Sequence, residues 1–131
     1  MSEEHTDALV FFGATGDLAY KKIFPALAAM EKRGRHLVPI ICVAKSAWTL
    51  DQLVARARES VQKNGVYDAA TFDRLAARLR YVDGDYSDAA TFRRIKTELG
   101  DAQRPAHYLA IPPALFGTVI EQLAASSCTN G

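Results

Sequence analysis

The sequence predicts an α/β protein built on a doubly wound parallel sheet. Short apolar runs alternate with amphipathic segments of helical length along the 131 residues. Strands that alternate with helices join into a parallel sheet through right-handed crossovers, which place helices on both faces. A glycine-containing turn follows the first apolar run, at the position where such sheets bind nucleotides. We therefore expect a truncated, Rossmann-like sheet of about four parallel strands, in a single domain that covers residues 1–131.

The first predicted strand, residues 7–12, is a run of aromatic and branched side chains that stops at a glycine. A helix follows over residues 17–33, because its apolar positions are compatible with one helical face and a glycine comes directly after it. Pro25 lies inside this helix and should kink or break it, since proline has no amide hydrogen to donate. The second strand, residues 36–44, is mostly apolar and therefore buried.

The middle of the chain predicts two helices and a weak strand. Thr49 has the side chain of an N-cap, and the helix that it starts covers residues 50–63 and ends at an Asn-Gly pair. A second helix covers residues 68–79 or 71–79, since Asp68 and Thr71 can each start it. The short run over residues 80–83 is the third strand.

The last part of the chain completes the alternation. Ser87 is the predicted N-cap of a helix over residues 88–99, which Gly100 ends. Residues 106–111 form the fourth strand, and a helix over residues 114–125 follows a Pro-Pro pair.

Composition excludes several classes of protein. The chain has 16 basic and 15 acidic side chains and a net charge of +1, so it is not a strongly basic nucleic-acid binder. Its 49% hydrophobic content is too high for a disordered chain, and no apolar run reaches the roughly 18 residues of a membrane span. Cys42 and Cys128 lack a metal-type spacing and fit a reducing cytosol, and the polar N-terminus is unlike a signal peptide. We expect a cytoplasmic protein without a metal site or a membrane partner.

The segment Gly13-Ala14-Thr15-Gly16-Asp17-Leu18-Ala19 lies between the first predicted strand and the first helix. Gly13 allows the tight turn, Gly16 lets a phosphate approach the backbone, and Ala19 lets the helix pack closely on the sheet. Backbone N–H groups at the helix start would bind the anion with help from the Thr15 hydroxyl, while Asp17 would cap the helix. The alternative is a turn that binds nothing. We interpret the segment as a dinucleotide-binding loop whose contacts are Gly13, Ala14, Thr15, Gly16, Asp17 and Leu18.

The residues that follow the second and third strands indicate which dinucleotide binds. An acidic residue after the second strand would favour NAD, whereas Lys45 and Ser46 can bind the 2′-phosphate of NADP. Asp85 could accept a hydrogen bond from the adenine amino group, and Tyr86 could pack on the adenine ring. The alternatives are a solvated lysine and a capped surface turn.

Three motifs in order along the chain resemble the glucose-6-phosphate dehydrogenase family. Residues 11–25 are similar to the signature at the start of these enzymes, residues 43–46 to their second strand end, and residues 108–116 to their fourth strand and following turn. The resemblance implies an oxidoreductase of glucose metabolism. It implies that the chain is the NADP-binding portion of an enzyme that oxidises glucose 6-phosphate to 6-phosphogluconolactone in the pentose phosphate pathway.

The resemblance also implies roles for single residues. The loop from Gly13 to Tyr20 would bind NADP, and Lys45 would contact its 2′-phosphate. Lys22 would lie between the cofactor and the sugar phosphate, where a solvated helix lysine is the alternative from spacing alone. Cofactor contacts near the nicotinamide are implied for Tyr108, Ala110 and Pro112.

The chain departs from the family pattern in two kinds of place. Tyr20 stands where the family commonly has lysine, and Lys45 stands where it usually has arginine, which makes a preference for NADP over NAD less secure. The chain also stops before the second domain that carries the sugar-phosphate site and the histidine base. None of His5, His36 and His107 is expected to replace that base, so we assign no catalytic residue to this chain.

These departures predict that the chain by itself shows little or no turnover, because hydride transfer needs a held sugar and a base. Glucose 6-phosphate would be a ligand only where the missing domain is present. The fourth strand would form an apolar sheet edge that favours self-association. Two alternatives remain: a non-catalytic NADP-binding module, and an atypical short-chain reductase, although no tyrosine has the lysine four positions later that the reductase mechanism needs.

Overall fold

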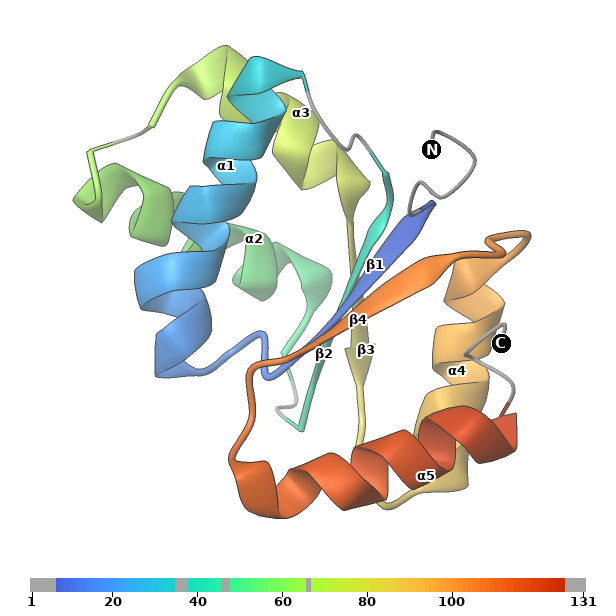
Figure 1. The fold of residues 1–131 in the computed structure, drawn as a ribbon. Helices are drawn as coiled ribbons and strands as arrows, with labels where there is room; N and C mark the ends of the chain where they lie inside the picture. The colour runs from blue at the N-terminus through green and yellow to red at the C-terminus, as the bar shows by residue number, and fades with distance from the viewer. Residues whose placement is uncertain (1–6, 35–37, 46–47, 66, 127–131) are drawn as a thin grey trace.

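A four-stranded parallel sheet forms the centre of the computed structural model, which describes residues 7–34, 38–45, 48–65 and 67–126 (Figure 1). The strands are β1 (Ala8–Phe12), β2 (Ile40–Ala44), β3 (Leu79–Asp83) and β4 (Pro105–Leu109). Their order in the sheet is β3-β2-β1-β4, and every neighbouring pair is parallel. The predicted Rossmann-like sheet of about four parallel strands is confirmed, and β1 lies in its interior.

Helices cover both faces of this sheet (Figure 1). They are α1 (Phe24–Arg33), α2 (Leu50–Lys63), α3 (Ala69–Arg78), α4 (Ala89–Leu99) and α5 (Phe116–Ser126). The first three pack on one face, and α4 and α5 pack on the other. The chain is therefore wound on both sides of the sheet, as the alternation of strands and helices predicts.

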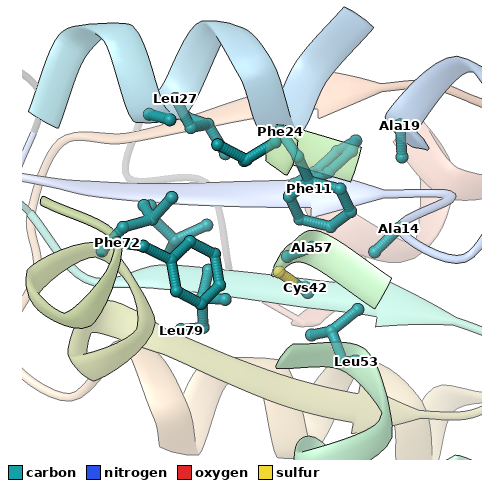
Figure 2. Close-up of a cluster of buried hydrophobic side chains, with 14 residues drawn as sticks. Phe11, Ala14, Ala19, Phe24, Leu27, Cys42, Leu53, Ala57, Phe72 and Leu79 are labelled. Atoms are coloured by element: carbon teal, nitrogen blue, oxygen red, sulfur yellow. The ribbon is translucent and has the colours of Figure 1, made fainter. Parts of the chain in front are cut away.

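Side chains of β1 alternate between two apolar cores. Phe11 points toward α1, where its ring makes an edge contact with Phe24 at 5.9 Å between centroids (Figure 2). Val10 and Phe12 point to the opposite face, where Phe12 stacks on Phe92 of α4 at 5.9 Å. A strand that is buried on both faces has no polar side, which explains why its sequence is a continuous apolar run.

The predicted break near Pro25 is a π-helical turn. Helical conformation begins at residue 17, passes through η2 (Ala19–Ile23) and continues as α1. The N–H of Phe24 bonds back five residues to the carbonyl of Ala19, and Pro25 then falls in the first turn of α1. Because the first turn of a helix has spare N–H groups, a proline costs little there. The π turn lets one long helical segment include the proline without an interior gap.

Capping residues confirm two predicted helix starts and correct one. Thr49 forms a reciprocal capping box with Gln52, and Asp68 caps α3. The cap of α4 is Asp88 rather than the predicted Ser87. The hydroxyl of Ser87 donates instead to Asp85, at 2.8 Å, so the carboxylate of Asp88 is left to accept from the first turn of α4.

Two strand boundaries and one helix start differ from the prediction by more than one residue. β2 begins at Ile40 rather than at residue 36; residues 35–37 lie outside the described part of the chain, and residues 38–39 form no strand. β4 ends at Leu109 rather than at residue 111, because β1 ends opposite it at Phe12. A 3-10 turn, η3 (Pro113–Leu115), precedes α5, which therefore starts two residues late.

The amino end of β4 is fixed against β1. The carboxylate of Asp7 accepts hydrogen bonds from the N–H of Gln103, at 2.7 Å, and of Arg104, at 2.8 Å. These bonds set the register that brings the end of β4 beside the turn after β1. Among the described strands, β4 forms one edge of the sheet. Self-association through that edge stays a prediction.

Candidate functional site

The loop between β1 and the first helical turn is tied to the neighbouring strand. The N–H groups of Gly13 and Ala14 both donate to the carbonyl of Val43 in β2, at 2.8 and 3.2 Å. The N–H of Gly16 turns back to the carbonyl of Gly13, at 3.1 Å. These three donors hold the loop in shape and are therefore not the ones that would bind an anion.

Gly13 has a position that no other residue can take without strain. Its φ of +89° lies in the left-handed region, and a Cβ there would stand 2.1 Å from the carbonyl oxygen of Ala110. The N–H of Ala110 donates to the carbonyl of Phe12, at 2.9 Å, which keeps the end of β4 against the turn. The expected tight turn at Gly13 is confirmed, and its cause includes this close approach of two backbones.

The last part of the loop, Gly16, Asp17 and Leu18, is exposed. The N–H groups of Asp17 and Leu18 have no acceptor among the residues that the structure describes. Both groups belong to the first turn of a helix, where free donors and the helix dipole favour a negative charge. A Cβ on Gly16 would meet only the carbonyl oxygen of Gly13, at 3.4 Å, so the space beside Gly16, next to these donors, is open.

Two alanines and one aspartate complete the loop. Ala14 and Ala19 are fully buried at the end of the core that faces α1, which confirms the close contact predicted for Ala19 (Figure 2). Asp17 is the first helical residue rather than the residue before the helix, and its side chain makes no cap hydrogen bond in the described part of the chain. The prediction that Asp17 caps the helix is therefore wrong.

Lys45 and Asp85 form an ion pair at the carboxyl ends of β2 and β3, with 3.2 Å between Nζ and Oδ2. The carboxylate of Asp85 also accepts from the N–H and the hydroxyl of Ser87, each at 2.8 Å. The backbone bond from Ser87, its hydroxyl bond and the Lys45 ammonium together lower the pKa of Asp85 to about 2. Two of the four residues predicted to contact the adenosine half, Lys45 and Asp85, are thus adjacent, while Ser46 lies outside the described residues.

We expect Asp85→Asn to lower the melting temperature of the chain, and we expect this loss to shrink between about pH 4 and about pH 2. Because the pKa of Asp85 falls from an ordinary 3.8 to about 2 on folding, the ionised carboxylate stabilises the folded chain fully above the unfolded pKa. That stabilisation disappears as the pH falls through the folded pKa. Thermal unfolding followed by circular dichroism at several pH values measures it.

The matched control for this experiment is Asp83→Asn. Asp83 is an exposed residue at the end of β3 whose carboxylate receives no hydrogen bond among the described residues. Its replacement should change the melting temperature less, and without the same pH dependence. A loss in Asp85→Asn that stays constant down to about pH 2 would show that the charge of Asp85 is not responsible.

Tyr86 lies under the loop. Its ring makes an edge contact with Phe12, with 5.8 Å between centroids, and its hydroxyl lies 3.4 Å from the carbonyl of Val43. Burial raises the pKa of the Tyr86 phenol. The same carbonyl accepts hydrogen bonds from the N–H groups of Gly13 and Ala14. Tyr86 therefore supports the loop from the face of the sheet that carries α4 and α5. Its predicted packing on adenine stays a prediction.

The residues predicted to contact the nicotinamide half lie beside Gly13. Tyr108 is exposed and makes an edge contact with Phe11, with 6.1 Å between centroids. Ala110 is half-buried against the turn, and Pro112 is exposed directly before η3. The loop, the end of β2 and the end of β4 therefore meet at the carboxyl edge of the sheet, where open α/β sheets bind their ligands.

The other lysine, histidine and cysteine residues considered from the sequence do not form a catalytic group at this edge of the sheet. Lys22 is exposed in η2, one helical turn beyond the open N–H groups. His107 sits in β4 with its ring against Phe12, at 6.3 Å between centroids, in agreement with a packed strand residue. His5 and His36 lie outside the described residues. Cys42 is buried, and burial raises the pKa of its thiol.

Sequence reasoning missed one charged residue at the site. Arg56 of α2 donates from a terminal nitrogen to the carbonyl of Gly16, at 3.4 Å, and its guanidinium lies over the ring of Tyr20. Forty residues separate Arg56 from Gly16, and no motif joins them. Only the packing of α2 beside η2 brings the two together.

Within the described residues, no group of histidine, cysteine, aspartate or glutamate side chains is arranged to hold a metal ion. Nor does any helix in that part of the chain have the length and apolar character that crossing a bilayer requires.

Comparisons with known proteins agree with this geometry. Residues 10–131 match the family model described as glucose-6-phosphate dehydrogenase, NAD binding domain. Glucose-6-phosphate 1-dehydrogenase 1 of Mycobacterium bovis is 44% identical over 119 residues, which are 91% of this chain and 26% of that protein. The chain thus spans about a quarter of the length of the curated relatives it matches.

Solved structures show the same relationship. The crystal structure of glucose-6-phosphate 1-dehydrogenase from Mycobacterium avium has a TM-score of 0.88 and 44% identity, and covers 94% of this chain and 27% of that one. A glucose-6-phosphate dehydrogenase in complex with its substrate glucose 6-phosphate has a TM-score of 0.79 and 28% identity, over 91% of this chain and 27% of that one.

Proposed function

This chain belongs to the glucose-6-phosphate dehydrogenase family, as its nicotinamide-dinucleotide-binding N-terminal portion, and from that premise we propose that it binds NADP at the carboxyl edge of its sheet. The open donors of the first helical turn carry the proposal. The N–H groups of Asp17 and Leu18 have no acceptor among the described residues and lie next to the open space beside Gly16, and a diphosphate is the anion that a dinucleotide presents there.

The arrangement of the other residues supports an extended dinucleotide. Lys45 and Ser46 would bind the 2′-phosphate, and Asp85 and Tyr86 would contact the adenine. On the other side of Gly13, the nicotinamide half would lie along Tyr108, Ala110 and Pro112. The exposed position of Tyr108 leaves its ring accessible beside the turn.

The reaction we propose for the enzyme is the oxidation of glucose 6-phosphate to 6-phosphogluconolactone, in the cytoplasm, as a step of the pentose phosphate pathway. When bound, NADP supplies the acceptor for the hydride that leaves the sugar carbon. This chain would hold and orient the cofactor, and Lys22 would approach the sugar phosphate as a point charge. We expect the 131-residue chain alone to show little or no turnover, because no histidine of the described part is placed as a base.

Lys45→Ala is expected to weaken NADP binding about tenfold and NAD binding less than about twofold. A hydrogen bond to a charged group contributes about 1.5 to 3 kcal/mol, and only NADP has the 2′-phosphate that Lys45 would meet. Isothermal titration calorimetry of the purified chain with each dinucleotide measures both affinities. The wild-type comparison of NADP with NAD is also the test of the proposed function itself.

Lys63→Ala is the control for this variant. Lys63 ends α2 at the opposite end from the site, so its removal changes the net charge equally without touching a phosphate. An equal loss of both dinucleotides in Lys45→Ala would mean that Lys45 does not bind the 2′-phosphate. A wild-type chain that binds neither dinucleotide would refute the proposed function.

A further inference from the structure

Arg56 is held rigidly beside the phosphate loop. The centre of its guanidinium lies 4.6 Å from the ring centroid of Tyr20 and 5.9 Å from that of Trp48. One terminal nitrogen donates to the carbonyl of Gly16, at 3.4 Å. An arginine between two aromatic rings and a carbonyl has lost most of its rotamer freedom, so a ligand that binds it meets a preorganised donor.

The Tyr20 ring that supports Arg56 is itself anchored to α2. The carbonyl of Tyr20 accepts a hydrogen bond from the hydroxyl of Ser60. The phenol hydroxyl of Tyr20 also forms a hydrogen bond with Glu59. Burial of the phenol is the main reason that the pKa of Tyr20 is raised, and the bond to Glu59 raises it further. Two contacts therefore fix this residue of the π turn against the helix that carries Arg56.

The charge of Arg56 is not neutralised by a carboxylate. Some other cations of the chain do have a carboxylate partner: Lys45 pairs with Asp85 at 3.2 Å, and Arg78 pairs with Glu31 at 3.0 Å. Among the described residues, no carboxylate lies within ion-pair distance of Arg56, and its Nε is buried without a hydrogen-bond partner. A fixed and unpaired guanidinium is unusual unless an anion binds it.

The place of Arg56 indicates which anion this is. Its guanidinium lies between Gly16 of the loop and Trp48, which follows Lys45 by three residues. In the proposed site, the adenosine ribose passes between the loop and the end of β2. We propose that Arg56 binds the 2′-phosphate of NADP together with Lys45, and so determines the preference of this site for NADP. This inference rests on the proposed function.

Arg56→Gln is expected to raise the dissociation constant for NADP about tenfold and that for NAD less than about twofold. Calorimetric titration of the purified chain with each dinucleotide measures the two constants. The matched control is Arg58→Gln, because Arg58 is an exposed arginine of the same helix whose guanidinium lies over Phe72 of α3, at 5.1 Å. Arg58→Gln should change neither constant.

Further variants separate binding from folding. Arg56→Lys keeps the charge without the fork and should give an intermediate loss of NADP affinity. Tyr20→Leu removes the supporting ring and should reproduce part of the loss in Arg56→Gln. The ³¹P resonance of the bound 2′-phosphate should shift between wild type and Arg56→Lys, which a purely structural role of Arg56 would not cause.

The outcomes distinguish this inference from the proposed function. A wild-type chain that binds neither dinucleotide overturns the proposed function and this inference with it. A wild-type chain that binds NADP, with unchanged affinity in Arg56→Gln or with equal losses for NADP and NAD, overturns only the role of Arg56. A ³¹P shift that is identical in wild type and Arg56→Lys overturns it as well.

Discussion

Replacing Gly16 by valine is expected to abolish saturable NADP binding while the chain stays folded. The first added carbon has room in the protein, since its nearest neighbour is the carbonyl oxygen of Gly13 at 3.4 Å. The branched side chain would instead fill the space in front of the open N–H groups of Asp17 and Leu18. A diphosphate could then no longer reach them, and we expect the affinity to fall at least about a hundredfold, because several charge-assisted hydrogen bonds are lost together.

The fluorescence of Trp48, the only tryptophan of the chain, reports this loss, because its ring lies near Arg56 at the edge of the loop. NADP should change the wild-type signal and leave that of Gly16→Val unchanged. Gly117→Val is the control. Gly117 is the second residue of α5, has open space around it and lies away from the loop. An unchanged NADP titration in Gly16→Val would contradict the role assigned to the loop.

Gly13→Ala is expected to destabilise the fold itself, by about 2 to 5 kcal/mol. Two costs combine, because the residue has a φ of +89° and the new Cβ would stand 2.1 Å from the carbonyl oxygen of Ala110. The left-handed conformation costs an L-residue about 1 to 2 kcal/mol, and a forced contact in a packed region costs about 1 to 3 kcal/mol. Urea unfolding followed by circular dichroism measures the sum as a change in the free energy of unfolding.

Gly34→Ala separates the two costs. Gly34 ends α1 with a φ of +71°, but a Cβ there would meet nothing within 4 Å. This variant should therefore show only the conformational cost of about 1 to 2 kcal/mol. Equal destabilisation by the two variants would mean that the end of β4 does not press against the turn as the structure shows.

The alternation of elements and most helix caps could be predicted from the sequence because they are local. The apolar run before Gly13 and the reciprocal pair of Thr49 and Gln52 each lie within a few neighbouring residues. Local competition also explains the error at α4, where Ser87 and Asp88 are adjacent and both can cap. The contact that decides between them, from Ser87 to Asp85, depends on the turn that follows β3.

The contacts across the site could not be predicted, because they join residues far apart in the chain. The approach of Gly13 to Ala110 depends on the register of β1 with β4. The ion pair of Lys45 and Asp85 depends on β2 and β3 being neighbours. Each residue could be identified from its own motif, but its partner is set by the order of strands in the sheet.

Arg56 shows the same limit most clearly. From its sequence position it is one polar residue on an amphipathic helix, like Arg58 two residues later. The π turn before Pro25 positions Tyr20, and Tyr20 positions the guanidinium. A helix irregularity forced by a proline thus helps to shape a site thirty-one residues away in the chain.

The central claim is that N–H groups of the first helical turn bind the diphosphate of a dinucleotide. Amide chemical shifts of the ¹⁵N-labelled chain during a titration with NADP test this claim most directly. We predict that the signals of Asp17 and Leu18 move the most and shift downfield, as charge-assisted hydrogen bonds form. Saturable NADP binding that leaves these two amide signals in place would contradict the claim.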